Sequence, residues 1–256
     1  LGMGGVSIAV DDPLLDPFVN PAKGSRINEM VVFASPLYYN ISNSISARTL
    51  PLGALFSSQN VFGGFSLAIQ QLEGSNPNLF QLLSSKYSNN MYMSGIIGAK
   101  LPNSNISIGG NIFVAGLDAI DVVDFLYAQS EKIEQTGYMV DGRVGITWDL
   151  EKDHYYEGIL LLNRFNMEHD VTYNDMPWAD VWPPVLRVEN NLDQTNTTGI
   201  HLGYVRPLYN TGWLIGANLT GNWKSHPKIP NYEIMNIPRD PGNTSAYDIG
   251  VGFSRK

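Results

Sequence analysis

Apolar and polar residues alternate at every second position over long stretches of this chain. In residues 138–150 the apolar set is Tyr138, Val140, Val144, Ile146 and Trp148, and the polar set is Asp141, Arg143, Thr147 and Asp149. Successive side chains of a β-strand point to opposite faces, so this segment predicts a strand with one apolar and one polar face. The same alternation recurs around Ile108, Leu202 and Ile249. The chain is therefore expected to be all-β.

The expected strands are long, and short and long connections alternate between them. The ranges are about 29–41, 46–57, 61–72, 89–101, 105–116, 137–150, 155–169, 196–208, 211–224 and 244–255. Most are longer than the roughly 5–6 residues typical of soluble strands, and they are long enough to cross a bilayer. Tight turns on one side and long loops on the other are typical of bacterial outer-membrane barrels. We therefore predict an antiparallel transmembrane β-barrel, with a soluble antiparallel sandwich as the alternative.

Aromatic residues near the strand ends favour the membrane. Trp213 and Trp223 bracket Ile215, Ala217 and Leu219, and Tyr138 and Trp148 have the same spacing on one face. Ten residues of tilted strand rise by about 25 Å, which is the height of a barrel's apolar band. Aromatic rings concentrate at the two lipid–water interfaces. Lipids of a Gram-negative outer membrane are therefore expected partners.

Composition excludes several other classes. A net charge of −8 argues against nucleic acid, which is bound through basic surfaces. The absence of cysteine excludes disulfides and thiolate metal sites, and the four histidines show no metal-binding spacing. The stretch with Asp11, Asp12 and Asp16 lacks a cation-binding spacing. We expect no metal, no cofactor, no catalytic residues and no enzymatic activity.

The first residues carry the most motif-like pattern. A glycine-rich run from Leu1 to Pro13 contains Gly2, Gly4 and Gly5, and it is followed by the Asn20-Pro21-Ala22 box. Residues 1–24 resemble the opening of the FadL-like outer-membrane family, which includes channels for hydrophobic compounds and the related PorV-like proteins of a secretion system. The resemblance implies that residues 1–28 form a hatch inside the barrel formed by residues 29–256. Gly2, Gly4, Gly5, Asn20, Pro21 and Ala22 would form this hatch.

The resemblance implies two functions. The first is diffusion of hydrophobic small molecules through the barrel. The second is a scaffold or subunit in a protein secretion or surface-attachment complex. Barrels of this family usually have fourteen strands, whereas this sequence offers about ten, so we expect it to be part of a longer barrel.

Candidate contact residues fall into two groups. Asp141, Arg143, Asp149, His201 and Asp248 lie on the predicted polar face and are expected to line the lumen, as a charge ladder or as structural ion pairs. Leu126, Tyr127, Trp178 and Trp182 belong to two unusually apolar loops. An exposed apolar loop indicates contact with either a hydrophobic ligand or a protein partner.

Overall fold

The structure is a computed structural model, and it describes most of the chain. The described residues are 12, 14–42, 45–75, 85–118, 130, 132–175, 185–209, 211–225 and 243–255. Two short helices, α1 (Asp16–Val19) and η1 (Pro21–Arg26), precede all the strands. No helix in these ranges is long and apolar enough to span a bilayer.

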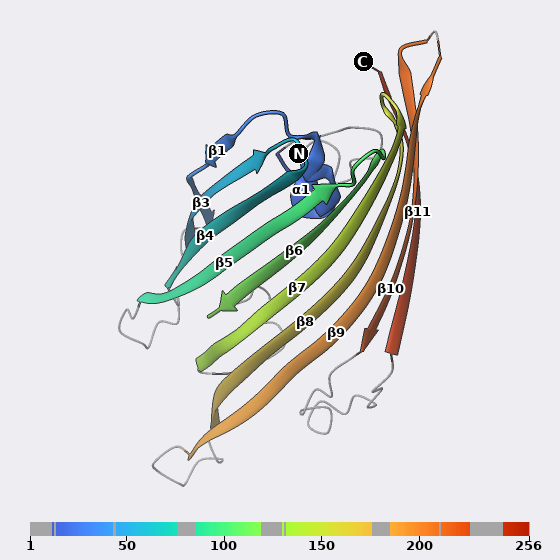
Figure 1. Ribbon diagram of the computed structural model, residues 1–256. Helices are drawn as coiled ribbons and strands as arrows, with labels where there is room; N and C mark the ends of the chain where they lie inside the picture. The colour runs from blue at the N-terminus through green and yellow to red at the C-terminus, as the bar shows by residue number, and fades with distance from the viewer. Residues whose placement is uncertain are drawn as a thin grey trace.

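The rest of the described chain is one antiparallel sheet (Figure 1). Its strands are β1 (Val31–Ala34), β2 (Leu37–Ser42), β3 (Ile45–Ser57), β4 (Val61–Ser75), β5 (Ser85–Lys100), β6 (Ile106–Leu117), β7 (Lys132–Glu151), β8 (His154–Asp175), β9 (Val185–Leu208), β10 (Trp213–Ser225) and β11 (Asn243–Arg255). From β3 to β11, each strand pairs with its neighbours in chain order. The all-β antiparallel prediction is confirmed.

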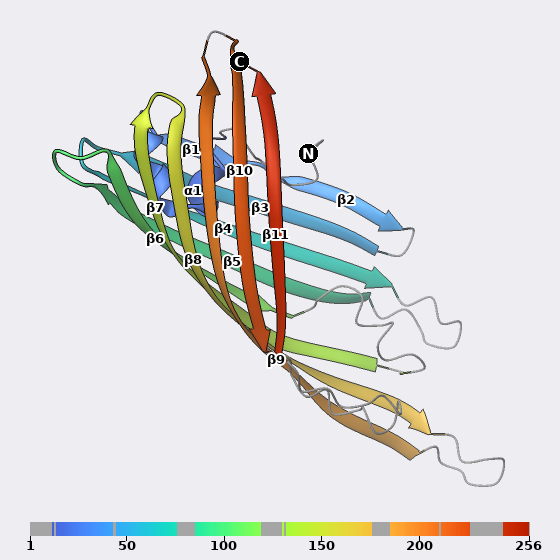
Figure 2. The ribbon, with the colours of Figure 1, turned by 90° about the vertical axis from the view of Figure 1, so that its right-hand side faces the viewer.

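The sheet is curved but not closed. Strands β1 and β2 form one edge and β11 the other, and these edges do not pair among the described residues (Figure 2). An open sheet agrees with the expectation that this chain forms part of a longer barrel, and it presents a concave and a convex face.

The first expected strand, 29–41, is interrupted in the structure. β1 and β2 both pair with β3, and the register continues unbroken from Ala34↔Leu52 to Leu37↔Thr49. Proline lacks the N–H that a strand ladder requires, so Pro36 interrupts the ladder. Only Ser35 N bonds across the gap, to Pro51 O at 3.2 Å.

β7, β8 and β9 extend well beyond the expected ranges 137–150, 155–169 and 196–208. They contain 20, 22 and 24 residues. Parts of the connections expected between these ranges are therefore strand. The convex face becomes polar in these extensions, with Glu134 opposite Asp170. The backbone ladder continues there, but the apolar alternation from which the ranges were predicted has ended.

Three of the four short connections contain a residue with positive φ. Asn103 has φ 55°, Asp153 has φ 61° and Gly212 has φ 70°. Asn, Asp and Gly adopt this left-handed region most readily, and it closes tight hairpin turns. The short connections β5–β6, β7–β8 and β9–β10 lie at the upper end of the sheet, the end that also carries α1 (Figures 1 and 2).

The two faces follow the predicted alternation. On the convex face Ile112, Val144 and Leu202 are exposed, whereas Asn111 and Asp141 on the concave face are buried. The aromatic residues predicted near the strand ends, Tyr138, Trp148, Trp213 and Trp223, also lie on the convex face. Near the short turns, the rings of Trp148, Tyr156 and Tyr204 lie side by side across β7, β8 and β9, with centroid separations of 5.9 and 4.8 Å. At the other end of the apolar band, Trp223 of β10 contacts Tyr247 of β11.

Candidate functional site

The N-terminal segment, residues 14–26, packs on the concave face of the sheet. Asp12 precedes it, and the Asp12 carboxylate accepts hydrogen bonds from the backbone N–H groups of Leu14 and Leu15 at 3.0 and 3.1 Å. Asn20 separates α1 from η1, and its Oδ1 accepts from Ala22 N at 3.1 Å. Pro21 takes the first position of η1, where its missing N–H has no helical partner to lose. The Asn-Pro-Ala box thus forms the junction between α1 and η1.

A pair of glycines in the sheet leaves space for the Asn-Pro-Ala box. Gly109 of β6 lies opposite Gly145 of β7. A Cβ added at Gly109 would come within 2.7 Å of the Pro21 carbonyl, and one added at Gly145 would overlap Asn20 Oδ1. The Asn-Pro-Ala box therefore touches bare backbone of the sheet, a close approach that only glycine permits.

Buried charges fix the segment beside the glycine pair. Lys23 Nζ lies 3.4 Å from Asp16 Oδ2 and 3.2 Å from Glu157 Oε2. Glu157, on β8, also accepts from Asn20 Nδ2 at 3.0 Å. Burial lowers the pKa of the Lys23 ammonium, but Glu157, Tyr155 and Asp16 raise it by more, so its pKa lies above its usual range. Lys23 therefore stays protonated.

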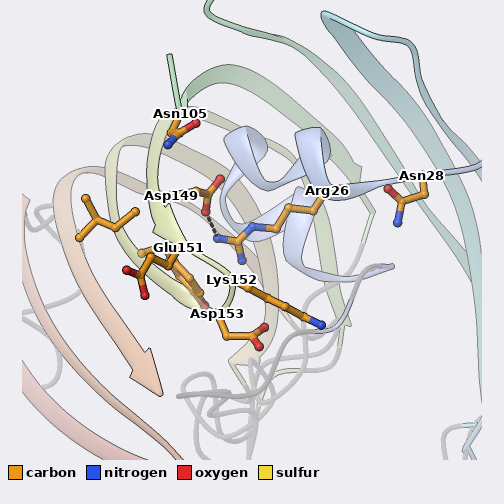
Figure 3. Close-up of a pocket in the computed structure, with 9 residues that line it drawn as sticks. Arg26, Asn28, Asn105, Asp149, Glu151, Lys152 and Asp153 are labelled. Carbon is orange, nitrogen blue, oxygen red and sulfur yellow. Dashed lines mark hydrogen bonds and ion pairs between the residues drawn. The ribbon is translucent and has the colours of Figure 1, made fainter. Parts of the chain in front are cut away.

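A second ion pair holds the end of η1. Arg26 Nη2 lies 2.7 Å from Asp149 Oδ1, and its guanidinium stacks 3.9 Å from the ring centre of Tyr155. These groups face a polar cavity of about 580 Å³ at the short-turn end of the sheet (Figure 3). Its lining is Arg26, Asn28, Asn105, Asp149, Leu150, Glu151, Lys152, Asp153 and Tyr155.

The opposite side of the segment is held through its backbone carbonyls. Asn111 Nδ2 donates to Phe18 O at 3.1 Å, and Asn111 Oδ1 accepts from Ser94 Oγ at 2.9 Å. Arg143 Nη1 donates to Phe18 O at 3.5 Å and to Val19 O at 3.4 Å. These carbonyls end the short helix α1, where no intrahelical donor remains for them.

Arg143 also belongs to a charge pair on β7. Its Nε donates to Asp141 Oδ1 at 2.7 Å, and Asn163 of β8 donates to Asp141 Oδ2 at 3.5 Å. A second cavity, of about 480 Å³, opens over these groups. Its lining is Phe18, Ser66, Ser94, Asn111, Phe113, Met139, Asp141, Arg143 and Asn163. The two cavities thus have different ends of the N-terminal segment in their walls, Phe18 in one and Arg26 in the other.

An apolar band lies on the concave face beyond this second cavity, towards the long connections. Tyr92, Ala115, Met139 and Phe165 are aligned in register across β5, β6, β7 and β8. They pack with Leu117, Met167 and Phe113 in one cluster. We call these seven residues the apolar belt. Phe113 and Met139 belong both to the belt and to the cavity wall.

The structure places each candidate lumen residue on the concave face. Asp141 and Arg143 form the charge pair, and Asp149 binds Arg26. His201 Nδ1 lies 2.8 Å from Thr220 Oγ1, and Asp248 is the register partner of Thr220. His201 and Asp248 are thus separated by Thr220. Gly2, Gly4, Gly5, Leu126, Tyr127, Trp178 and Trp182 lie outside the described residues.

Several residues of the site were not found from the sequence. Lys23 and Arg26 were overlooked although they follow the Asn-Pro-Ala box directly. Glu157 lies on the concave face of β8, and a charged residue on that face could have indicated a contact inside the sheet. Phe113 and Met139 were apolar exceptions on a face expected to be polar. Across the described ranges, no group of three or more His, Cys, Asp or Glu residues could hold a metal ion.

Comparison with known proteins gives a likeness of fold. The crystal structure of the Pseudomonas putida toluene transporter TodX matches with a TM-score of 0.48 and 12% identity, covering 99% of this chain and 78% of that one. No protein-family model matches the chain, and no curated protein matches it.

Proposed function

We propose that this chain forms an outer-membrane channel through which hydrophobic small molecules diffuse, with the N-terminal segment as its hatch. The apolar belt is the observation that supports this proposal. The interior of a water-filled porin is polar, so a row of apolar side chains across four strands is not expected in a passage for hydrophilic solutes. A molecule leaving water gains free energy in proportion to the apolar surface that it buries there.

The proposed route follows the concave face. A ligand enters at the side of the long connections, lies on the apolar belt and reaches the cavity beside Phe18, Phe113 and Met139. The N-terminal segment separates that cavity from the polar one beside Arg26. Passage therefore requires this segment to move. No covalent chemistry is involved in diffusion of this kind.

The convex face supports the membrane setting. Exposed aliphatic residues fill a band bounded by Trp148, Tyr156 and Tyr204 on one side and by Trp223 and Tyr247 on the other. An apolar band between two aromatic girdles is the surface that an outer-membrane barrel presents to lipid.

Uptake of radiolabelled octane by cells that carry the protein tests this function. Met139→Asn should lower the uptake rate by about tenfold, because an amide in the belt opposes transfer of an apolar molecule. Met139→Leu is the matched control and should leave the rate nearly unchanged. Equal uptake by cells with and without the protein, together with stable co-purification of a large partner, would contradict transport and favour the scaffold alternative.

We also propose that Leu126, Tyr127, Trp178 and Trp182 form the apolar landing site outside the membrane. Replacing Trp178 and Trp182 with alanine should lower octane uptake at low octane concentrations, because the two indoles supply much of the apolar surface of their loop. Unchanged uptake at every concentration would remove these residues from the route.

A further inference from the structure

The cavity between the apolar belt and the hatch has a charged but electrically balanced wall. Among the described residues that line it, Asp141 and Arg143 are the charged ones. They contact each other through Nε and Oδ1 at 2.7 Å and through Nη2 and Oδ2 at 3.5 Å. Asp141 is 7% exposed, so its carboxylate is largely withdrawn from water. The pair therefore presents polar groups to the cavity without a net charge.

The hydrogen bonds of the guanidinium are largely committed. Besides Asp141, Arg143 reaches the carbonyls of Phe18 and Val19. A carboxylate entering the cavity would have to compete with Asp141 for the same fork of donors while lying close to its negative charge. Two carboxylates that share one cation repel each other, and the repulsion is strong where water is excluded.

Neutral hydrogen-bonding groups meet no such obstacle. The two oxygens of a carboxylate can accept about four hydrogen bonds. The Asp141 carboxylate accepts three, two from Arg143 and one from Asn163. A ligand hydroxyl can donate the fourth. Asn163 carries a second amide N–H and a carbonyl oxygen at the same cavity wall. Phe18, Phe113 and Met139 supply an apolar side for the rest of the molecule.

We propose that Asp141 and Arg143 make this cavity selective for uncharged amphipathic molecules with a hydrogen-bonding head, such as long-chain alcohols, over carboxylates and ammonium ions of equal length. The inference rests on the proposed function and adds a substrate class to it. The volume of about 480 Å³ lies in the range of small-molecule pockets. The preference for uncharged ligands comes from the mutual neutralisation of Asp141 and Arg143, and not from a cavity wall without charges.

Saturable binding of four probes to the protein in lipid nanodiscs tests the proposal. The probes are octane, 1-octanol, octanoate and octylammonium, and empty nanodiscs provide the background. The native protein should bind 1-octanol at least about tenfold more tightly than either ion, the size of effect expected from one charge-assisted hydrogen bond. Asp141→Asn keeps the shape of the side chain but leaves Arg143 without its counter-ion, so octanoate should then bind more tightly than octylammonium. Arg143→Gln should produce the opposite order.

Asp193→Asn is the matched control. Asp193 also lies on the concave face, opposite Met167, but it does not line this cavity, so its loss should leave the probe order unchanged. Native protein that binds octanoate as tightly as 1-octanol overturns the selectivity, and so does an unchanged order in both Asp141→Asn and Arg143→Gln. In either case octane binding leaves the proposed function standing, whereas a protein that binds none of the probes contradicts the proposed function itself.

Discussion

The two faces of the sheet follow different rules. On the convex face the same pattern recurs from strand to strand within the apolar band, where aliphatic side chains such as Ile112 and Val144 repeat at every second position. On the concave face the environment changes from one end to the other. It is apolar at the belt, polar at Asp141 and Arg143, bare at Gly109 and Gly145, and ionic at Lys23 and Glu157.

This difference reflects what each face contacts. In the proposed function the convex face contacts lipid, which is uniform in the plane of the membrane, so every strand would meet it with the same pattern. The concave face instead contacts a specific peptide segment and two cavities, and its pattern runs in rows across neighbouring strands. A row such as Tyr92, Ala115, Met139 and Phe165 becomes visible only when the register is known.

The largest expected effect comes from placing a charge on each face at a similar height. Val144→Arg puts a cation on the convex face near the middle of the apolar band and should destabilise the membrane-inserted protein by about 2–4 kcal/mol. Thr197→Arg puts the same charge on the concave face opposite Asn163 and should cost much less. Urea unfolding in liposomes measures both. Equal losses would mean that the two faces do not differ in their contact with lipid.

The second effect compares two glutamates of β8 on opposite faces. Glu157→Ala leaves the buried Lys23 paired with Asp16 and removes the acceptor of Asn20 Nδ2, so seating of the hatch should weaken by about 2 kcal/mol. Glu168→Ala on the exposed convex face should change stability by less than about 0.5 kcal/mol. Single-channel conductance in planar bilayers should show openings in Glu157→Ala. A channel as closed as the native one would remove Glu157 from the seat of the hatch.

The third effect separates two neighbouring glycines of β6. Gly109→Ala should push the Asn-Pro-Ala box away from the sheet, because its methyl group meets the Pro21 carbonyl, at a cost of about 1–2 kcal/mol. Gly110→Ala points to the convex face, where the nearest atom is Arg143 O at 3.9 Å, and should be tolerated. Sensitivity of cells to a large antibiotic should rise for the first variant and stay unchanged for the second.

The smallest effect concerns one buried hydrogen bond of the concave face. Ser94→Ala removes the donor to Asn111 Oδ1 and should cost about 1 kcal/mol. The Asn111 amide would then be held less firmly against Phe18 O, which should appear as faster hydrogen exchange near α1. Exchange that rises equally over the whole sheet would indicate a general loss of stability.

Most of the fold could be predicted because the convex face repeats. The alternation in residues 138–150 and the spacing of Trp213 and Trp223 placed strands and faces correctly. The extensions of β7, β8 and β9 could not be predicted, because polar residues such as Glu134 and Asp170 occupy the convex face there. The break at Pro36 was missed within a strand that otherwise keeps its register.

Less of the site could be predicted. Asp141, Arg143 and Asp149 were placed in the lumen from the alternation alone. Their partners could not be found in this way. Asn163 reaches Asp141 because of the register between β7 and β8, and Arg26 reaches Asp149 because the N-terminal segment packs on the concave face. The role of Gly109 and Gly145 is likewise invisible until the two strands are paired.

The contacts of the N-terminal segment also set an order of assembly. Asn20 and Glu157 are separated by 137 positions in the chain, and Phe18 and Arg143 by 125. Contacts between such distant positions carry a large loop-closure entropy cost and form late unless the intervening chain is already organised. A stretch that precedes every strand therefore reaches its place only after β6, β7 and β8 have come together. Until then the concave face is not covered by the N-terminal segment, and the backbone at Gly109 and Gly145 has no contact with Asn20 and Pro21.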